Sequence, residues 1–275
     1  MDHVVERIGI IAQARLRSTR LPRKVLAPIG AAPLLQHLTQ RLKLARKATT
    51  VVIATSDEPA NTPIIELCQT IDVACFVGSE QDTLDRMIQA ARCYELDAIV
   101  RVTADNPLTD PYSIDEGIRI FRAQALDYFD NICYRGHPHG MGYEIISRRV
   151  LEFSRAQWQM PENLEHVTWA LRRHLSLFRH AFFEVPPELH RPRYRLSVDH
   201  PEDLELLRHV YAALNFRDDA TLREIVTLLD AHPEMVALNA QYADTLMTRQ
   251  TLENWQLPLD DTTRQRWAEF AHTKK

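Results

Sequence analysis

Residues 8–24 read IGIIAQARLRSTRLPRK and join a short apolar run to a strongly basic loop. The apolar run, residues 8–14, is typical of a buried parallel strand. The loop holds five cations and no acid: Arg15, Arg17, Arg20, Arg23 and Lys24. Ligands of open α/β sheets bind where the strands end. Cations, hydroxyls and backbone N–H groups at such a place favour a phosphate-binding loop over a merely solvated basic loop.

The chain downstream of this loop alternates apolar runs with stretches of helical periodicity. We expect strands at 50–54, 72–77 and 98–103, and helices at 33–44, 63–70, 82–94 and 113–123. Asp82 is a plausible N-cap for the third of these helices. The alternation predicts an α/β fold with a mainly parallel sheet and helices on both faces.

The pattern becomes less regular after about residue 127. We expect further strands at 127–132, 143–146, 178–185 and 194–198. We expect further helices at 147–157, 162–174, 201–214, 219–230 and 233–247. Residues from about 248 onward are polar and are predicted to be loosely held.

Composition excludes several classes of protein. The chain has 275 residues, 45% hydrophobic and 25% charged, which is ordinary globular composition. A net charge of −4 disfavours a general nucleic-acid binder. No apolar run is long enough to span a membrane, and the N-terminus lacks the pattern of a signal peptide. Without C-x-x-C spacing, we expect buried, reduced thiols in a cytoplasmic protein at Cys68, Cys75, Cys93 and Cys133.

Two acids stand at the ends of predicted strands far apart in the sequence. Asp105 follows strand 98–103, and Asp199 follows strand 194–198 and precedes a helix that begins with a proline. Each could instead be a local turn or helix-cap residue. Mg²⁺ binds one or two carboxylates together with phosphate oxygens. Two such acids and a cationic loop on three strands therefore favour a metal-assisted phosphate site.

Common catalytic and nucleotide-binding signatures are missing. The sequence contains no G-x-G-x-x-G, no G-x-x-x-x-G-K-[ST] and no G-x-S-x-G. The pair His137 and His139 is expected to be an ordinary loop pair. The Glu165-His166 pair is expected to lie on a half-buried helix face, although a general-base or substrate-binding role stays open.

Six segments together resemble the cytidylyltransferase family that includes the CMP-Kdo and CMP-sialic acid synthetases, and most closely its branch named for spore coat polysaccharide biosynthesis protein SpsF. They are Gln13-Ala14-Arg15-x-x-Ser18-Thr19-Arg20-Leu21-Pro22-x-Lys24-Val25-Leu26, Ala54-Thr55-Ser56, Gly78-Ser79-Glu80-x-Asp82-x-Leu84-x-Arg86, Arg101-x-Thr103-x-Asp105-x-Pro107-Leu108, Glu165-His166-Val167-Thr168 and Val198-Asp199-x-Pro201-Glu202-Asp203-Leu204. The resemblance covers residues from about 7 to 214.

The resemblance implies a fold and an assembly. The fold would be a three-layer α/β/α structure of the nucleotide-diphospho-sugar-transferase type, with a mixed, mainly parallel sheet. Residues 1–214 would form the nucleotidyltransferase domain, and residues 131–193 a protruding dimerisation element. The protein would be a homodimer. Residues 215–275 are left as a C-terminal helical extension that the resemblance does not explain.

The resemblance also implies roles for individual residues. Catalytic residues would be Arg15, Lys24 and Asp105, with Mg²⁺ held by Asp105 and Asp199. Nucleotide-binding residues would be Ala12, Gln13, Ala14, Arg15, Ser18, Lys24, Ser79, Asp82, Arg86 and Thr103. Acceptor-binding residues would be Arg101, Tyr143, Glu144 and His166.

The sequence departs from the pattern of this branch at three places. Arg23 stands where glycine is usual, and Ala104 stands where glycine commonly precedes the metal-binding acid. The segment Gly140-Met141-Gly142-Tyr143-Glu144 lacks the aspartate of the branch's G-x-D-x-E motif. The third departure bears on acceptor contacts.

The function implied is a Mg²⁺-dependent nucleotidyltransferase. It would transfer CMP from CTP to a sugar acid, a sugar phosphate or a phosphonate and release pyrophosphate. The alternatives are a glycosyltransferase that uses a nucleotide sugar and a non-catalytic nucleotide-binding protein. Glycosyltransferases of similar fold usually bind their metal with Asp-x-Asp, whereas here Asn106 follows Asp105 and no second aspartate lies two residues on.

Overall fold

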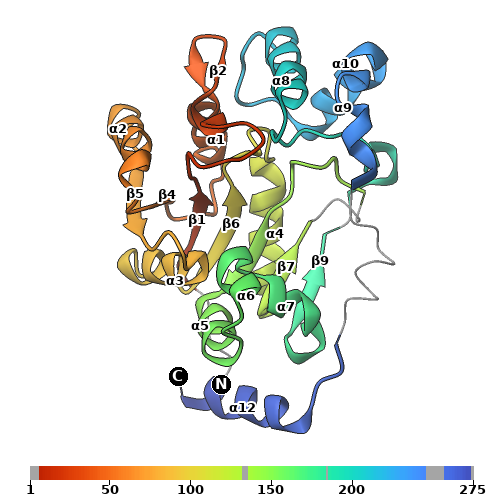
Figure 1. The fold of residues 1–275 in the computed structure, drawn as a ribbon. Coiled ribbons are helices and arrows are strands. Elements are labelled where there is room, and N and C mark those ends of the chain that lie inside the picture. The colour runs from red at the N-terminus through yellow and green to blue at the C-terminus, as the bar shows by residue number, and fades with distance from the viewer. Residues whose placement is uncertain (1–5, 132–135, 184, 246–256, 274–275) are drawn as a thin grey trace.

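A seven-stranded mixed sheet forms the centre of the protein, in a computed structural model that describes residues 6–131, 136–183, 185–245 and 257–273 (Figure 1). Four neighbouring strands are parallel: β5 (Ala74–Gly78), β4 (Val51–Ser56), β1 (Ile8–Gln13) and β6 (Ala98–Thr103). Beyond β6, the order continues with β8 (Glu144–Ser147), β7 (Tyr128–Asp130) and β9 (His180–Phe182). Only β8 runs antiparallel to its neighbours, so the predicted mainly parallel sheet is confirmed.

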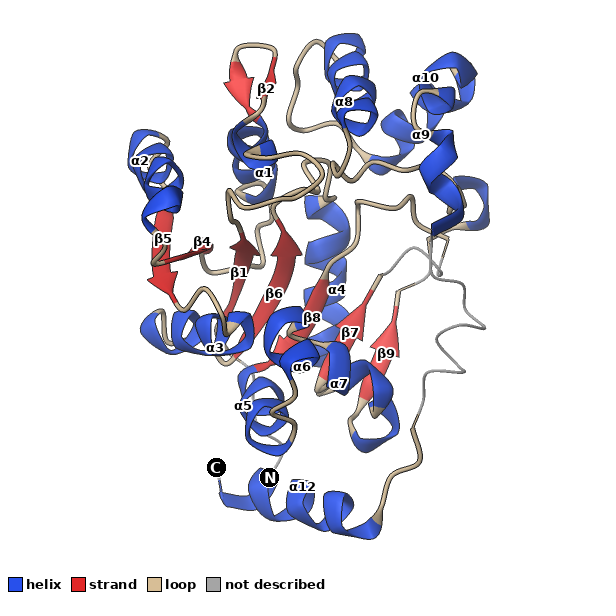
Figure 2. Cartoon of the chain, viewed as in Figure 1, coloured by secondary structure: helices blue, strands red, loops and turns tan. Residues whose placement is uncertain are grey.

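Helices cover both faces of the sheet, as Figure 2 shows. One core cluster joins the sheet to α1 (Leu34–Leu42), α2 (Thr62–Thr70) and α4 (Pro111–Ala123). The other joins it to α3 (Thr83–Cys93), α5 (Arg148–Gln157) and α7 (Trp169–Arg173). Side chains alternate along β1, where Ile10 packs in the first cluster and Ile11 in the second. The predicted three layers are therefore confirmed.

Helix starts follow the expected local chemistry. The Asp82 carboxylate accepts a hydrogen bond from the backbone N–H of Asp85 at 2.7 Å, which confirms its predicted N-cap role for α3. Asp110 caps α4 in the same way and is followed by Pro111 at the first helical position. These caps fix where the loops that follow β5 and β6 end.

A third apolar cluster lies beyond the ends of β1 and β6 (Figure 1). It joins α8 (Pro201–Ala213), α9 (Leu222–Ala231), α10 (Pro233–Ala237) and the hairpin of β2 (Pro28–Ile29) and β3 (Ala32–Pro33). The predicted domain boundary at residue 214 falls inside this cluster. Residues 215–237 therefore share a core with the nucleotidyltransferase domain.

The stretch 131–193 is built into the body of the molecule. It supplies β8 and β9 to the sheet and α5, α6 (Pro161–His166) and α7 to one face. β8 lies between β6 and β7, and its residue Glu144 pairs with Arg101 of β6 on one side and with Asp130 of β7 on the other. The described part of this stretch thus belongs to the sheet and its covering helices, and its role as a dimerisation element stays a prediction. The homodimer stays a prediction.

Three other local predictions differ from the structure. The expected helix 162–174 is two helices, because Val167 has φ +59° and Asn163 accepts the N–H of Ala170 through its side chain. The expected strand 194–198 forms one isolated bridge between Arg195 and His139, because its N–H groups pair with loops instead. The expected helix 233–247 ends at Ala237 and is followed by the 3-10 helix η6 (Ala240–Thr245).

The described part of the C-terminal tail, residues 257–273, includes a helix that was not predicted. Residues 261–273 form α12 (Asp261–Thr273), which lies against α5 (Figure 1). The ring of Trp267 lies 5.1 Å from that of Phe153 and 5.0 Å from that of Phe178. Phe270 joins the same cluster. Two aromatic residues in a mostly polar segment were enough to anchor it, since each buries a large apolar area.

No helix in the described ranges is both long and apolar enough to cross a bilayer. Of the cysteines, Cys68, Cys75 and Cys93 are free thiols, and Cys133 lies outside the described residues. Cys68 is buried and Cys75 is half-buried, but Cys93 is exposed. The prediction of buried thiols is therefore wrong for Cys93.

Candidate active site

A cleft of about 630 Å³ opens at the carboxyl ends of β1 and β6. Its walls come from the loop after β1, the end of β6, α6 and the segment before α8. The lining residues are Gln13, Arg15, Arg17, Ser18, Thr19, Arg20, Lys24, Val25, Glu80, Thr103, Ala104, Asp105, Glu165, His166 and Asp199. The cleft thus brings together the basic loop, Asp105 and Asp199. Arg15 of the loop and Asp199 are 184 positions apart in the sequence.

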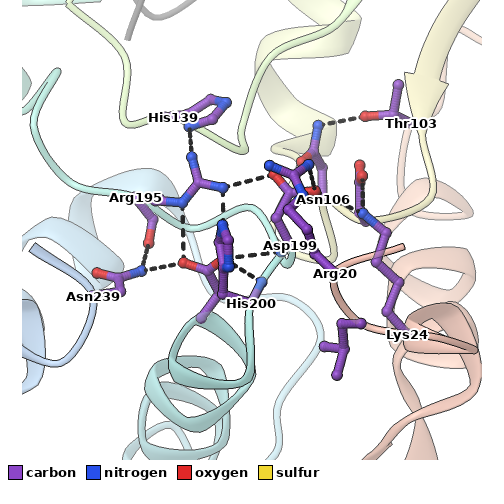
Figure 3. Close-up of polar contacts among 12 residues, drawn as sticks. Arg20, Lys24, Thr103, Asn106, His139, Arg195, Asp199, His200 and Asn239 are labelled. Carbon is purple, nitrogen blue, oxygen red and sulfur yellow. Dashed lines mark hydrogen bonds and ion pairs between the residues drawn. The ribbon is translucent and has the colours of Figure 1, made fainter. Parts of the chain in front are cut away.

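Lys24 connects the two acids. Its Nζ donates to Asp105 Oδ2 at 2.6 Å and to Asp199 Oδ1 at 2.9 Å (Figure 3). Burial by itself would lower the pKa of Lys24, but the two carboxylates outweigh it and raise the pKa above its usual value. Lys24 is therefore held as a cation between two anions.

The loop closes on Lys24 through an unusual backbone conformation. Arg23, the residue that replaces the branch's glycine, has φ +60° and ψ +21° and precedes the 3-10 helix η1 (Lys24–Leu26). That left-handed region favours glycine, which accounts for the usual residue at this position. The arginine adopts the same region at some conformational cost.

Asp199 is surrounded by cations. Besides Lys24, its Oδ1 accepts from Arg20 Nη2 at 2.8 Å, and its Oδ2 accepts from Arg195 Nη2 at 2.6 Å. Burial opposes ionisation of this carboxyl, but Lys24, Arg20 and Arg195 together lower its pKa below the usual value. Asp199 is therefore a carboxylate at neutral pH.

Neither acid plays the local structural role that was the alternative. The N-cap of α8 is His200, and the side chain that bonds back to the N-cap is Asp203 at the third helical position. The carboxylate of Asp105 accepts from Lys24, a side chain 81 positions away. Both acids thus direct their carboxylates at the cleft.

A smaller pocket of about 90 Å³ adjoins the cleft on the side of α3 and α6. Its lining residues are Gln13, Ala14, Arg15, Thr83, Arg86, Glu165 and His166. Arg86 is 3% exposed, its Nη1 donates to the carbonyl of Ser79, and its Nε has no partner among the described residues. Arg86 is therefore a largely buried cation on the wall of this pocket.

Several predicted nucleotide-binding residues support the site from behind. Ala12 is fully buried in β1, between Ile53 of β4 and Val102 of β6. The hydroxyl of Ser79 accepts from the N–H of Asp82, and the Asp82 carboxylate accepts from Arg155 Nε at 3.1 Å. Neither Ser79 nor Asp82 lines the cleft. Gln13, Ala14, Arg15, Ser18, Lys24, Arg86 and Thr103 do line the cleft or its side pocket.

The predicted acceptor-binding residues do not lie together. His166 lines the cleft, whereas Tyr143 is buried in the core and its hydroxyl donates to the carbonyl of Ser113 at 2.5 Å. Glu144 is 3% exposed and faces the other side of the strand. It binds Arg101 at 2.5 Å, Arg172 at 2.9 Å and the hydroxyl of Tyr128 at 2.8 Å. Glu144 and Arg101 therefore neutralise one another instead of facing an acceptor.

Asp105 and Asp199 could together take part in binding a divalent cation. Among the described residues, no three His, Cys, Asp or Glu side chains could hold a metal ion without other ligands. Asp105 and Asp199 nevertheless converge on one cation, the ammonium of Lys24. Two carboxylates completed by phosphate oxygens are the set that Mg²⁺ accepts, so these residues suit a metal–nucleotide complex rather than a stand-alone metal site.

Some site residues were not predicted as such. Glu80 and Glu165 line the cleft, and Glu165 pairs with Arg15 at 3.3 Å. Both stand inside conspicuous motifs, which could have marked them. Arg195 contacts Asp199 without lining the cleft, and no local pattern marks it.

Comparison with known proteins agrees with this geometry. Residues 8–232 match the family described as Cytidylyltransferase. Spore coat polysaccharide biosynthesis protein SpsF of Bacillus subtilis is 34% identical over 232 residues, which cover 82% of this chain and 95% of that protein. An 8-amino-3,8-dideoxy-manno-octulosonate cytidylyltransferase of Shewanella is 27% identical over 144 residues, 52% of this chain and 56% of that protein.

A solved structure shares the fold. The structure of a cytidylyltransferase from Leptospira borgpetersenii superposes with a TM-score of 0.79 at 29% identity, covering 84% of this chain and 96% of that one. The family match and the SpsF similarity each extend over most of the chain, and the family match includes the loop after β1, Asp105 and Asp199. The chain therefore belongs to the cytidylyltransferase family and is a nucleotidyltransferase.

Proposed function

We propose that the cleft binds CTP with Mg²⁺ and transfers CMP to an oxygen of a small acidic sugar-like acceptor, with release of pyrophosphate. The observation that carries this proposal is the bridge from Lys24 to both Asp105 and Asp199, at 2.6 and 2.9 Å, beside a loop with four more cations. Family membership supports CTP as the nucleotide.

The basic loop is suited to the triphosphate. Arg15, Arg17 and Arg20 line the cleft with Lys24, and Ser18 and Thr19 add hydroxyls to the same wall. The exposed pair of Arg15 with Glu165 is weak, so phosphate oxygens can displace it. Lys24 and Arg15 would stabilise the charge that develops on the phosphates during transfer. The pocket at Arg86 and Gln13 would receive the base.

Asp105 and Asp199 would hold the magnesium ion, with phosphate oxygens as its other ligands. When bound there, the ion would supply Lewis-acid stabilisation of the α-phosphate and acidify the acceptor hydroxyl. The acceptor oxygen forms a bond to the α-phosphorus, the bond to the pyrophosphate oxygen breaks, and the hydroxyl proton passes to solvent. The protein's own contribution is to align these groups and neutralise charge.

The acceptor is proposed to be acidic because the free cations lie on the cleft wall. Arg17 lines the cleft and forms no ion pair with any described residue. A carboxylate or phosphate of the acceptor can bind there with a charge-assisted hydrogen bond. The Shewanella relative is named for an octulosonate, a sugar acid, which supports the same class of acceptor. His166, also on the wall, would contact the acceptor.

Release of pyrophosphate tests the proposal. Each of four nucleoside triphosphates is incubated with sugar acids, sugar phosphates and phosphonates, with Mg²⁺ or with a chelator. We expect release with CTP, an acidic acceptor and Mg²⁺ together. Equal release with every nucleotide, or activity that survives chelation, would contradict the proposal. Transfer from a nucleotide sugar without pyrophosphate release would favour the glycosyltransferase alternative.

A further inference from the structure

A network of buried polar residues lies behind Asp199, on the side away from Lys24 (Figure 3). Its members are His139, Arg195, Asp203 and Asn239. Arg195 is 3% exposed, Asp203 is 1% exposed and Asn239 is 1% exposed. None of the three lines the cleft, so any influence on the reaction has to pass through Asp199.

Asp203 is the centre of this network. Its Oδ2 accepts from the backbone N–H groups of Asp199 at 2.9 Å and His200 at 2.8 Å. Its Oδ1 accepts from Arg195 Nε at 3.0 Å and from Asn239 Nδ2 at 2.8 Å. One carboxylate thus fixes both the backbone at Asp199 and the guanidinium that binds the Asp199 side chain.

Arg195 sets which oxygen of Asp199 faces the cleft. Its Nη2 donates to Oδ2 of Asp199 at 2.6 Å, whereas Oδ1 is the oxygen that accepts from Lys24 and Arg20. The other terminal nitrogen, Nη1, bonds Nδ1 of His139 at 3.0 Å. With Nε, Nη1 and Nη2 all engaged, the guanidinium plane cannot rotate without breaking hydrogen bonds.

Asn239 completes the network from a distant part of the chain. Its Nδ2 donates to the backbone carbonyl of Arg195 at 2.9 Å as well as to Asp203. Both partners are acceptors, so the amide nitrogen must face them. Asn239 lies between α10 and η6, beyond residue 232 where the family match ends. The adjacent Tyr242 stacks on His200 with ring centres 3.8 Å apart.

We propose that Asn239 is a positioning residue for the metal-binding carboxylate: it braces Arg195 and Asp203, which orient Asp199 Oδ1 toward the cleft. The C-terminal segment is then part of the active-site scaffold rather than a separate extension. This inference rests on the proposed function, because it takes Asp199 as a ligand of the metal–nucleotide complex. Substitution of a residue that holds a metal ligand in place typically changes metal affinity or activity by about 10- to 100-fold.

The test measures Mn²⁺ binding in the presence of CTP, without an acceptor, from the electron paramagnetic resonance signal of the free ion. Full-length Asn239→Ala is compared with wild type and with Glu234→Ala as the matched control. Glu234 is an exposed residue of α10 whose carboxylate pairs with His232 at 2.9 Å, away from the Arg195 network. We expect Asn239→Ala to bind Mn²⁺ about tenfold more weakly and the control to bind as wild type does.

The Mn²⁺ affinity of each site and the number of sites per chain distinguish a positioning role of Asn239 from a folding defect. A folding defect lowers the number of sites per chain, whereas a misplaced Asp199 lowers affinity at each site. The thermal unfolding midpoint is measured for the same samples so that binding is compared below it. Asn239→Ala with reduced site number but wild-type affinity would overturn the inference. Wild-type protein that binds no Mn²⁺ with CTP would overturn the proposed function, and with it this inference.

Discussion

Two carboxylate clusters lie at the same edge of the sheet and have opposite characters. Glu144 is 3% exposed and is bound by Arg101, Arg172 and Tyr128. Asp105 and Asp199 keep 23% and 16% of their side-chain surface exposed on the cleft, where Lys24 bridges them. In the first cluster the Glu144 carboxylate is ion-paired and shielded from water, which is typical of a structural role. The second has oxygens that a mobile cation or phosphate can reach, which suits binding.

The comparison bears on the predicted acceptor-binding role of Glu144, which stays a prediction. A motif position identified the residue type but not its partners. The tertiary structure shows that Arg101 of β6 and Arg172 of α7 form ion pairs with this carboxylate. We therefore expect substitutions in the Glu144 cluster to change the free energy of unfolding more than activity. Substitutions around Asp105 are expected to change activity more than the free energy of unfolding.

Glu144→Gln has the largest expected effect. Removing the charge of the buried Glu144 breaks its ion pairs with the half-buried Arg101 and Arg172, so we expect the free energy of unfolding to fall by about 3–5 kcal/mol. Urea denaturation followed by circular dichroism measures this change. Folded Glu144→Gln protein is expected to retain the wild-type Michaelis constant for the acceptor. A raised acceptor constant with unchanged stability would restore the acceptor-binding role.

Asp105→Asn is expected to lower activity strongly and to change stability little. The turnover number for pyrophosphate release should fall by about 10²-fold or more, as when one charge-stabilising group is removed from a catalytic site. The free energy of unfolding should change by less than about 1 kcal/mol, because Lys24 keeps Asp199 as a partner and the site is partly exposed. Near-normal turnover in this variant would remove Asp105 from the site.

The stability difference between wild type and Glu144→Gln should depend on pH. Burial alone would raise the pKa of Glu144, but Arg172, Arg101 and Tyr128 lower it to about 2, from an ordinary value of 4.5. A carboxylate with a lowered pKa contributes its full stability above the ordinary pKa and loses it as pH falls toward the folded pKa. Urea denaturation at successive pH values should show the difference constant near neutrality and shrinking below about pH 4.5. A difference that grows in acid would contradict the assigned ion pairs.

Arg15→Ala has the smallest expected effect. Its ion pair with Glu165 is exposed, at 45% and 52% of the two side chains, so stability should change by less than about 0.5 kcal/mol. The Michaelis constant for CTP should rise about tenfold, the equivalent of one charge-assisted hydrogen bond to phosphate. Arg119→Ala is the matched control, since Arg119 forms an equally exposed pair with Glu116 on α4. An equal change in the two variants would place Arg15 outside the triphosphate site.

The sequence by itself determined the sheet, the basic loop after its first strand and the two acids. Apolar runs, helix caps and motif residues are local signals, and parallel strands necessarily bring their carboxyl ends to one edge. The strand 98–103 and the cap at Asp82 were thus predictable from neighbouring residues alone. Lys24 and Asp105 could be predicted to meet because each follows a strand of the sheet, whereas Asp199 follows only an isolated bridge and was assigned to the same site by family resemblance.

Tertiary structure alone decided which charges are matched and which stay open. Arg172 on helix α7 reaches Glu144 on strand β8, and Asn239 reaches Asp203 across 36 positions, at sequence separations that no periodicity encodes. The aromatic anchoring of α12 on Phe153 is hidden for the same reason. A hydrogen bond or ion pair depends on ångström-scale placement of both partners. Sequence specifies the partners' chemistry, but only packing of the whole core specifies their placement.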